Sequence, residues 1–271
     1  MTARLMIWNI RGVRDRKSKG YLRRMVRGNS VEVVALMEIK ANNFQRKDAD
    51  WLLGRGWNFA VQPSEGMSAG IIIMWSWVNI NITITTLHMV AFQINLEGRK
   101  VMNCCVIYGP KDHCRRREVW EEVRCMDTGG NPLMVAGDFN IIMSQEEKRG
   151  GRKFRFGKEQ QELADLMQDM QLTDVGFIGN IFTWCNGKTG GARILERLDR
   201  VLLNSVGLQD FPNCAVTHLG RLGSDHCPLL IDIGCRQARK RISRAQFEIV
   251  WLQFSQGNRC CAPCMEQKCE R

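Results

Sequence analysis

The sequence predicts an α/β protein in which two β-sheets pack face to face and helices cover their outer faces. Three observations carry this prediction. Short apolar runs typical of strands recur along the chain, amphipathic helical patterns are interleaved with them, and residues 69–107 contain successive strands separated by short turns. A chain with many strands and interleaved helices buries its apolar faces most simply in stacked layers.

The apolar runs predict strands, and a periodicity near 3.6 predicts helices. In the last predicted helix, Leu163, Leu166, Met167 and Met170 fall on one face. We expect the strands at 69–107 to form an antiparallel meander. The expected strands are 4–9, 31–37, 57–62, 69–76, 79–86, 89–97, 99–107, 132–138, 181–185, 196–203, 214–218 and 227–233. The expected helices are 17–28, 44–54, 114–126 and 158–171.

Length and composition favour one large domain followed by a different tail. The chain has 271 residues, is 44% hydrophobic, and has only six prolines and no internal repeat. We therefore expect a catalytic domain at 1–235 and a basic, poorly ordered tail at 236–271. In the tail, Cys261, Cys264 and Cys269 resemble part of a zinc knuckle, but the required histidine is missing, so an unstructured end is favoured over a metal site.

No apolar stretch is long and uninterrupted enough to predict a membrane span, and no secretory signal is visible at the N-terminus. The twelve cysteines do not predict a disulfide scaffold, because such scaffolds are small and secreted. Most lie singly within apolar runs, where cysteine behaves as a small hydrophobe. We expect a reducing compartment.

The net charge of +11 predicts a polyanionic partner. Basic residues cluster at 11–24, 114–120 and 147–158, and residues 236–271 carry eight basic and three acidic groups. Such a surface attracts polyanions without specifying one, and DNA or RNA is the natural partner. The alternative is a solvated basic face on an enzyme with another substrate.

Polar residues stand where several predicted strands begin or end. Asp138 and Asn140 are two residues apart, so in a strand both would face one point. A polar residue at a strand end is more often a turn or cap residue, and His226 alone could be a core histidine. The recurrence of the pattern nevertheless favours a site. Its members are Asn9, Glu38, Tyr108, Asp138, Asn140, Asp199, Ser224, Asp225 and His226.

These residue types suit metal-assisted hydrolysis of a phosphodiester. Carboxylates and amide oxygens are the ligands that Mg²⁺ prefers, and a histidine beside a carboxylate is oriented for acid, base or electrostatic work. The chain lacks the phosphate-binding loop of nucleotide triphosphatases and the G-x-S-x-G elbow of serine hydrolases. Attack of a metal-activated water on a phosphodiester fits the inventory best.

Six motifs carry a family resemblance, in this order: WNIRG, LMEIK, YGP, AGDFN, RLDRVLLN and SDHCPL. The chain resembles the endonuclease/exonuclease/phosphatase superfamily over about residues 4–235. More narrowly, it is similar to the endonuclease domain of plant LINE-type non-LTR retrotransposons. The resemblance implies a DNase-like, four-layer sandwich whose site lies where strand ends of both sheets converge.

Residue by residue, the resemblance implies a magnesium site, with Mn²⁺ as the alternative ion. Glu38 would be the main ligand, supported by Asn9 and Asp225. Arg11 stands where repair endonucleases carry an acid, which removes one metal ligand and adds a phosphate contact. Ile39 replaces a small polar residue next to Glu38.

The same resemblance implies the catalytic groups. Asp138 would orient or deprotonate the attacking water, and Asn140 would hold this water or the scissile phosphate. His226, paired with Asp199, would hydrogen-bond a phosphate oxygen and stabilise developing charge. Tyr108 would contact the phosphate or the leaving oxygen.

A further set of residues is expected to contact nucleic acid. The segment 181–187 predicts either core packing or a surface hairpin that touches DNA, and a basic segment follows it at once. The expected contacts are Arg11, Trp184, Lys188, Arg193 and Ser224.

The sequence thus predicts a magnesium-dependent DNA endonuclease that nicks one strand and leaves a 3′-hydroxyl. The alternatives are a non-catalytic nucleic-acid-binding remnant, and a phosphatase or phosphodiesterase of the same superfamily. Since no polymerase sequence follows, we expect a truncated retroelement copy. We also expect a monomer without an obligate protein partner, acting in the nucleus because of its substrate.

Overall fold

The computed structural model describes residues 3–64, 70–96, 101–126 and 128–234. The predicted tail at 236–271, with its three spaced cysteines, lies outside the described residues. None of the helices in the described part of the chain is long and apolar enough to cross a membrane.

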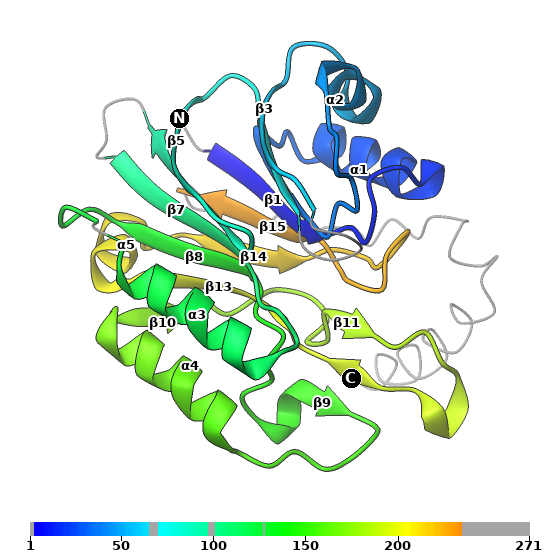
Figure 1. Cartoon of the computed structure of the whole chain (residues 1–271), viewed down its shortest axis with the longest axis vertical. Coiled ribbons are helices and arrows are strands. Elements are labelled where there is room, and N and C mark those ends of the chain that lie inside the picture. Colours follow the sequence, from blue (N-terminus) through cyan, green and yellow to red (C-terminus); the bar gives the residue numbers. More distant parts are fainter. Residues whose placement is uncertain (1–2, 65–69, 97–100, 127, 235–271) are drawn as a thin grey trace, which may run out of the picture. The chain divides into compact units, whose positions relative to one another are not determined.

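Two six-stranded β-sheets form the centre of the fold (Figure 1). In spatial order, the first sheet contains β14 (Ala215–His218), β15 (Leu229–Ile233), β1 (Ala3–Asn9), β2 (Val33–Met37), β4 (Ile71–Trp75) and β3 (Asn58–Gln62). The second contains β10 (Leu172–Asp174), β13 (Asp199–Asn204), β8 (Leu133–Asp138), β7 (Val101–Tyr108), β6 (Met89–Asn95) and β5 (Asn79–Thr85). A small third sheet contains β11 (Trp184–Cys185), β12 (Leu195–Glu196) and β9 (Lys148–Arg149).

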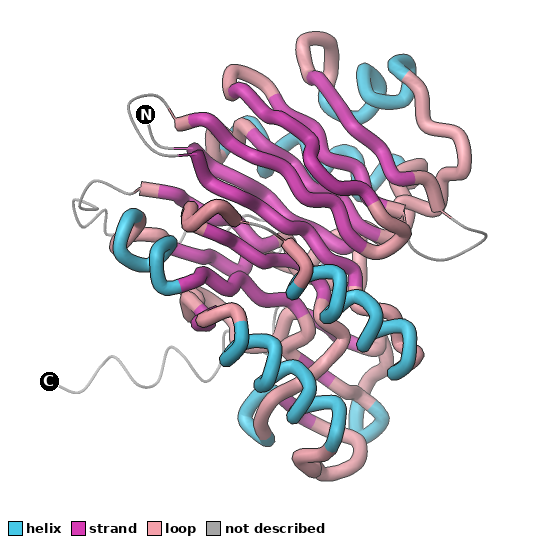
Figure 2. Tube along the Cα trace, turned by 60° about the vertical axis from the view of Figure 1, so that its left-hand side comes forward, coloured by secondary structure: helices cyan, strands magenta, loops and turns pink. Residues whose placement is uncertain are grey.

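Helices cover the outer faces of both sheets, as Figures 1 and 2 show from two directions. The first sheet is covered by α1 (Arg16–Gly28) and α2 (Arg46–Leu53). The second is covered by α3 (His113–Arg124) and α4 (Lys158–Asp169). A short helix, α5 (Ser205–Asp210), follows β13, and two single 3₁₀ turns lie at Gln145–Glu147 and Gly190–Ala192.

Three apolar cores separate these four layers. Phe92 lies in the core between the two sheets, Leu22 and Leu52 fasten α1 and α2 to the first sheet, and Trp120 and Leu163 fasten α3 and α4 to the second. Each such side chain, fully buried, contributes roughly 1.5–3 kcal/mol to folding. The predicted two-sheet sandwich with outer helices is therefore confirmed.

The strand directions bring the predicted polar residues to one edge. β1 runs parallel to β2, and Asn9 pairs with Met37, the residue before Glu38. β7 runs parallel to β8, and Tyr108 pairs with Asp138. Gly137 has φ +139° and a Cβ there would stand 2.1 Å from the Ile107 carbonyl oxygen, so only glycine fits where these two strands end.

Three details differ from the sequence-based expectation. β4 pairs with β2 and β3 in the first sheet, so the antiparallel meander contains only β5, β6 and β7. The strand expected at 181–185 is reduced to β11, and the strand expected at 196–203 divides into β12 and β13. Hydrophobic pattern identifies a buried strand but not the sheet to which it belongs, because both sheets contribute equally apolar faces to the central core.

Candidate active site

Asn9, at the end of β1, forms hydrogen bonds with one carboxylate from each of the two sheets. Its side chain is completely buried, and Nδ2 donates one hydrogen bond to Glu38 Oε1 at 3.0 Å and another to Asp138 Oδ2 at 2.9 Å. Glu38 directly follows β2, and Asp138 ends β8. Residues that are 129 positions apart in the sequence are thereby held within one hydrogen-bond length.

His226 lies between two aspartates of the second sheet. Its Nδ1 is 2.9 Å from Asp199 Oδ2, and its Nε2 is 3.7 Å from Asp138 Oδ2. Asp199 begins β13 and pairs in register with Asp138 of β8. All three side chains are at least 98% buried. The hydrogen bond to Asp199 fixes the ring and leaves Nε2 facing the position beside Asp138.

The environment shifts the pKa values of this group toward the neutral range. Burial raises the pKa of Asp138 to about 7, although the nearby His226 opposes the shift. Burial alone would lower the pKa of His226, but the carboxylates of Asp199 and Asp138 outweigh it and raise that pKa to about 9. At neutral pH, His226 is therefore a cation, while Asp138 is present in both its ionised and its protonated form.

Asn140 and Tyr108 complete the arrangement. The backbone N–H of Asn140 donates to Asp138 Oδ1 at 2.9 Å, and its Nδ2 donates to the Gly109 carbonyl at 2.7 Å. Burial raises the pKa of Tyr108, and the Glu38 carboxylate to which it is hydrogen-bonded raises it further, so the phenol stays protonated. Asn140 thus orients Asp138, while Tyr108 offers an O–H group beside Glu38.

Backbone strain is concentrated at this edge. Arg11, Glu38 and Asn140 have φ values of +54°, +50° and +53°. Left-handed backbone at a residue other than glycine costs about 1–3 kcal/mol and persists only where the surrounding structure imposes it. Such strain clusters at functional sites, and here three members of one group share it.

Arg11 and Trp184 surround the two remaining carboxylates. The Arg11 guanidinium lies 3.5 Å from Glu38 Oε1 and 3.4 Å from Asp225 Oδ1. The Trp184 indole N–H donates to Asp225 Oδ2 at 3.0 Å. Asp225 is therefore tied to Arg11 and Trp184, while Arg11 places a fixed positive charge next to the carboxylate of Glu38.

These side chains open into one cavity of about 280 Å³, which we call the strand-end cavity. Charged groups of both signs converge in this cavity. It is lined by Arg11, Glu38, Lys111, Arg116, Asp138, Asn140, Glu159, Trp184, Glu196, Leu198 and His226. A solvated, charged cavity of this kind suits a phosphate group better than an apolar ligand.

A hard divalent cation fits the oxygen groups of this cavity. Asn9 Oδ1 is buried and has no hydrogen-bond partner among the described residues, which is unusual for a buried acceptor. The neighbouring Glu38 carboxylate is the kind of ligand that Mg²⁺ takes. Ligand atoms of Asp138, Asp199 and His226 also lie within 4.8 Å of one another. Since Asp199 is already hydrogen-bonded to His226, the Asn9–Glu38 side fits an ion better.

Three of the residues expected to contact nucleic acid do not line the strand-end cavity. Ser224 donates its hydroxyl to the Asn9 carbonyl at 2.8 Å, so it braces the loop rather than facing the cavity. Lys188 is exposed, and Arg193 is half-buried beside the turn at Gly190–Ala192. Trp184 and Arg11 do line the cavity.

The sequence analysis did not identify several residues that hold or surround the site. Thr183 Oγ1 is completely buried and accepts hydrogen bonds from the backbone N–H groups of Leu198 and Asp199 at 3.0 and 3.1 Å. Lys111 and Arg116 come from the start of α3, and Arg116 pairs with Glu159 of α4 at 2.6 Å. The cationic pattern after YGP was the only sequence signal for these two residues.

A buried ionic network also stands behind β13. Glu147 pairs with Arg200 at 2.5 Å and with Arg197 at 3.0 Å, and Arg197 pairs with Asp174 at 2.8 Å. Arg200 also donates to the Ile141 carbonyl at 3.0 Å. Arg197 and Arg200 flank Asp199 in the sequence, but both bind Glu147 and Asp174, which leaves Asp199 to His226.

Comparisons with known proteins find a matching family model and several structures with a similar fold. A model described as the endonuclease/exonuclease/phosphatase family matches residues 6–226. An AP endonuclease from Leishmania major is similar in structure, with a TM-score of 0.67 and 16% identity, over 86% of this chain and 88% of that one. No curated protein matches the chain by sequence.

Two further structures share the fold. The endonuclease domain of TRAS1, a telomere-specific non-LTR retrotransposon, has a TM-score of 0.65 and 15% identity, over 87% of this chain and 100% of that domain. An AP endonuclease from Archaeoglobus fulgidus has a TM-score of 0.62 and 14% identity, over 86% of this chain and 100% of that one. Identities this low show a shared fold and no more.

Proposed function

The chain belongs to the endonuclease/exonuclease/phosphatase family, and from that premise we propose that it is a metal-dependent DNA endonuclease. It hydrolyses one phosphodiester bond of a duplex and leaves a 3′-hydroxyl and a 5′-phosphate. The observation that carries the proposal is the placement of Asn9, Asp138 and His226 side by side, with Asp138 and His226 lining the strand-end cavity. The net charge of +11 supports a polyanionic substrate.

Each group has a distinct task in the proposed reaction. Asp138 accepts the proton of the attacking water, because its raised pKa makes it a base near neutral pH. His226 is a cation held by Asp199, and its Nε2–H donates to a non-bridging phosphate oxygen as charge develops there. Tyr108, whose O–H group lies beside Glu38, would turn that group toward the phosphate.

Asn9 and Glu38 would hold the divalent ion, for which Mg²⁺ is the best match and Mn²⁺ the alternative. When bound, this ion supplies Lewis-acid stabilisation of charge on the phosphate and the leaving oxygen. Arg11, between Glu38 and Asp225, adds a permanent cation where a scissile phosphate would enter. We propose that Lys188 and Arg193 contact flanking phosphates of the duplex, that the protein acts as a monomer, and that it works in the nucleus, where such a substrate lies.

Plasmid nicking by the purified full chain tests the proposal. We expect conversion of supercoiled DNA to open circles in Mg²⁺ and none in EDTA, with activity lost in Asp138→Asn and His226→Ala. Asp169→Asn is the matched control, since this aspartate is half-exposed and pairs with Arg124 on the helical face. DNA binding without nicking by the wild type would contradict the proposal and favour a binding remnant. Hydrolysis of a small phosphomonoester but not of plasmid would contradict it in favour of a phosphatase.

A further inference from the structure

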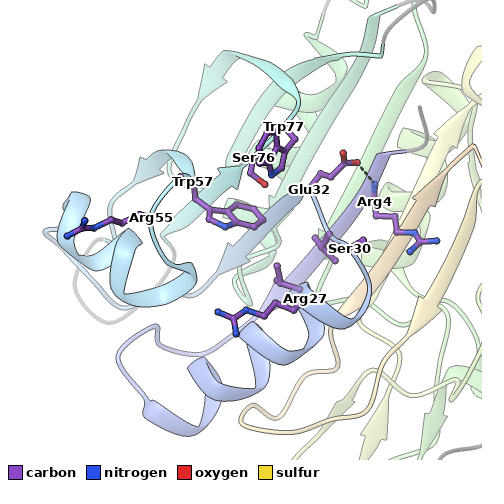
Figure 3. A pocket seen from close by; sticks show the side chains of 11 residues that line it. Arg4, Arg27, Ser30, Glu32, Arg55, Trp57, Ser76 and Trp77 are labelled. Carbon is purple, nitrogen blue, oxygen red and sulfur yellow. Dashed lines mark hydrogen bonds between the residues drawn. The ribbon is translucent and has the colours of Figure 1, made fainter.

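A second and larger cavity lies at the other end of the first sheet. Its volume is about 640 Å³, and we call it the tryptophan cavity. Figure 3 shows its side chains. The lining residues are Arg4, Val26, Arg27, Ser30, Val31, Glu32, Arg55, Gly56, Trp57, Ser76 and Trp77.

The tryptophan cavity is separate from the strand-end cavity. Glu32 directly precedes β2 and Glu38 directly follows it, so the two cavities are about 20 Å apart along the strand at 3.3 Å per residue. They share no lining residue. Nothing in the proposed hydrolysis uses the second cavity.

Two indoles and two guanidiniums dominate this cavity. Trp77 is 93% exposed, more than any other large apolar side chain among the described residues. Trp57 is half-buried, and in Figure 3 its ring lies between Trp77 and Arg27 of α1. Arg27 and Arg55 are exposed, and neither guanidinium has an ion-pair or hydrogen-bond partner in the described part of the chain.

Trp77 combines this exposure with an unusual backbone conformation. This residue has φ +63°, in the left-handed region that bulky side chains rarely adopt. It lies in the three-residue connection Ser76–Val78 that takes the chain from β4 in the first sheet to β5 in the second. A ring of this size, held in water, leaves a large aromatic face available to a flat partner.

Glu32 is the one acidic residue among those that line this cavity, and it bonds to the backbone of Arg4. Glu32 Oε2 accepts the backbone N–H of Arg4 at 3.4 Å, a bond drawn in Figure 3. The Arg4 guanidinium is paired with Asp232 at 3.1 Å, and it also donates to the Asn29 carbonyl at 2.9 Å. Asp232 therefore balances the charge of Arg4, and the guanidiniums of Arg27 and Arg55 outnumber the single Glu32 carboxylate that lines the cavity.

Helix α1 runs between the two ends of the sheet and carries further positive charge. It begins just after the loop that contains Arg11, ends beside the tryptophan cavity at Gly28, and is about 20 Å long. It contains no acidic residue, and its basic residues Arg16, Lys17, Arg24 and Arg27 are exposed. Exposed cations are thus present near both ends of α1, where they favour a polyanion that extends along the helix.

We propose that the tryptophan cavity binds a segment of single-stranded nucleic acid, with one base stacked on Trp77 or Trp57 and the adjoining phosphates on Arg27 and Arg55. Aromatic faces next to unpaired cations are the means by which proteins hold single strands without reading their sequence. A duplex buries its base faces, so the indoles select an unpaired strand. This site goes beyond the proposed function and does not require that the chain cleave DNA.

Binding of an eight-residue thymidine oligonucleotide to the full chain in EDTA tests the site, with fluorescence anisotropy as the readout. Trp77→Asn removes the ring and places at φ +63° a residue that accepts this conformation. We expect it to weaken binding about tenfold, and Arg27→Ala with Arg55→Ala to do the same and to reduce the salt dependence. Trp51→Ala is the matched control, because Trp51 is an exposed indole of α2 outside this cavity.

Two competitors separate stacking from charge. An abasic oligonucleotide of the same length keeps the phosphates, and we expect Trp77→Asn to leave its affinity unchanged. An oligo-glutamate peptide has comparable charge and no bases, and equal competition by this peptide would overturn the proposal in favour of an acidic protein partner. Equal oligonucleotide affinity for the wild type and Trp77→Asn would overturn it as well.

Photo-crosslinking locates the bound strand directly. A 5-iodouracil base in the oligonucleotide should crosslink to the peptides that contain Trp57 or Trp77, and crosslinks found only around the strand-end cavity would overturn the proposal. Plasmid nicking by Trp77→Asn should equal that of the wild type. If the wild type does not nick but crosslinks at Trp77, the endonuclease proposal fails and the single-strand site stands.

Discussion

Asn9 and Glu38 stand at one end of β1 and β2, and Arg4 and Glu32 stand at the other. At the first end the polar side chains are nearly all buried, bonded to one another and supported by further layers of contacts. At the second end Trp77, Arg27 and Arg55 are exposed, and neither of these two arginines has a partner in the described part of the chain. The same two strands therefore carry a preorganised site and an open one.

The two ends differ because catalysis and the binding of a flexible strand place different demands on side chains. A reaction needs donors and acceptors fixed before the substrate arrives, because reorganisation during the reaction would add to its barrier. Holding a flexible strand needs aromatic area and charge, and it tolerates several geometries. Burial is thus greatest where atoms must not move, whereas left-handed backbone occurs at both ends, for example at Glu38 and at Trp77. Substitutions at the two ends should therefore differ in effect, with the largest losses at the buried end.

Loss of the buried groups should abolish nicking. Asp138→Asn removes the base, and Asp199→Asn removes the carboxylate that orients His226 through a 2.9 Å hydrogen bond. We expect each change to lower the nicking rate by about 10²–10⁴-fold, the usual contribution of a positioned acid or base. Single-turnover kinetics on a nicking substrate measure it, with circular dichroism as the control for folding. A loss smaller than tenfold in Asp199→Asn would remove His226 from the proposed mechanism.

Buried charge should also dominate stability at the catalytic end. Arg200→Ala leaves Glu147 and Asp174 without part of their counter-charge in a buried network, and we expect unfolding to become easier by about 3–5 kcal/mol. Arg46→Ala breaks an exposed pair with Asp50 and should cost less than about 1 kcal/mol. Urea denaturation of both variants measures the contrast. Equal costs would show that burial does not set the strength of these pairs.

The pH dependence of nicking should follow the two shifted pKa values. Asp138 works as a base only when ionised, so the rate should rise as the pH increases through about 7. His226 works as a cation, so the rate should fall as the pH increases through about 9. The profile of the nicking rate at saturating Mg²⁺ should therefore be bell-shaped, with its maximum near pH 8. A rate that is flat from pH 6 to 8 would assign the base to another group.

The smallest effect is expected at the open end. Trp77→Asn removes an indole that is 93% exposed, so little packing is lost, and the new residue tolerates the left-handed backbone. The free energy of unfolding should stay within about 0.5 kcal/mol of the wild-type value, as is usual for surface changes. Thermal and urea denaturation measure it. A large destabilisation would mean that Trp77 serves the fold rather than a ligand.

Most of the longer strands and helices could be predicted from the local sequence pattern. Apolar runs located the major strands to within a few residues, and helical periodicity located α1 to α4, because both signals come from burial of one face of an element. The motifs in order named the residues that meet in the strand-end cavity, since parallel neighbours such as β1 and β2 end at the same edge. The short elements β9, β10 and α5 were missed, because two to six residues carry too little periodic signal.

Other properties arise only when distant segments meet. The sequence by itself determined the alternation of strands and helices, the positive charge and the residue types at the strand ends. The tertiary structure places β4 in the first sheet, pairs Arg200 with Glu147, and leaves Trp77 exposed in the same cavity as Arg27. The physical reason is that periodicity reports whether a side chain is buried, whereas partner, pKa and cavity depend on which buried or exposed groups lie within a few ångströms.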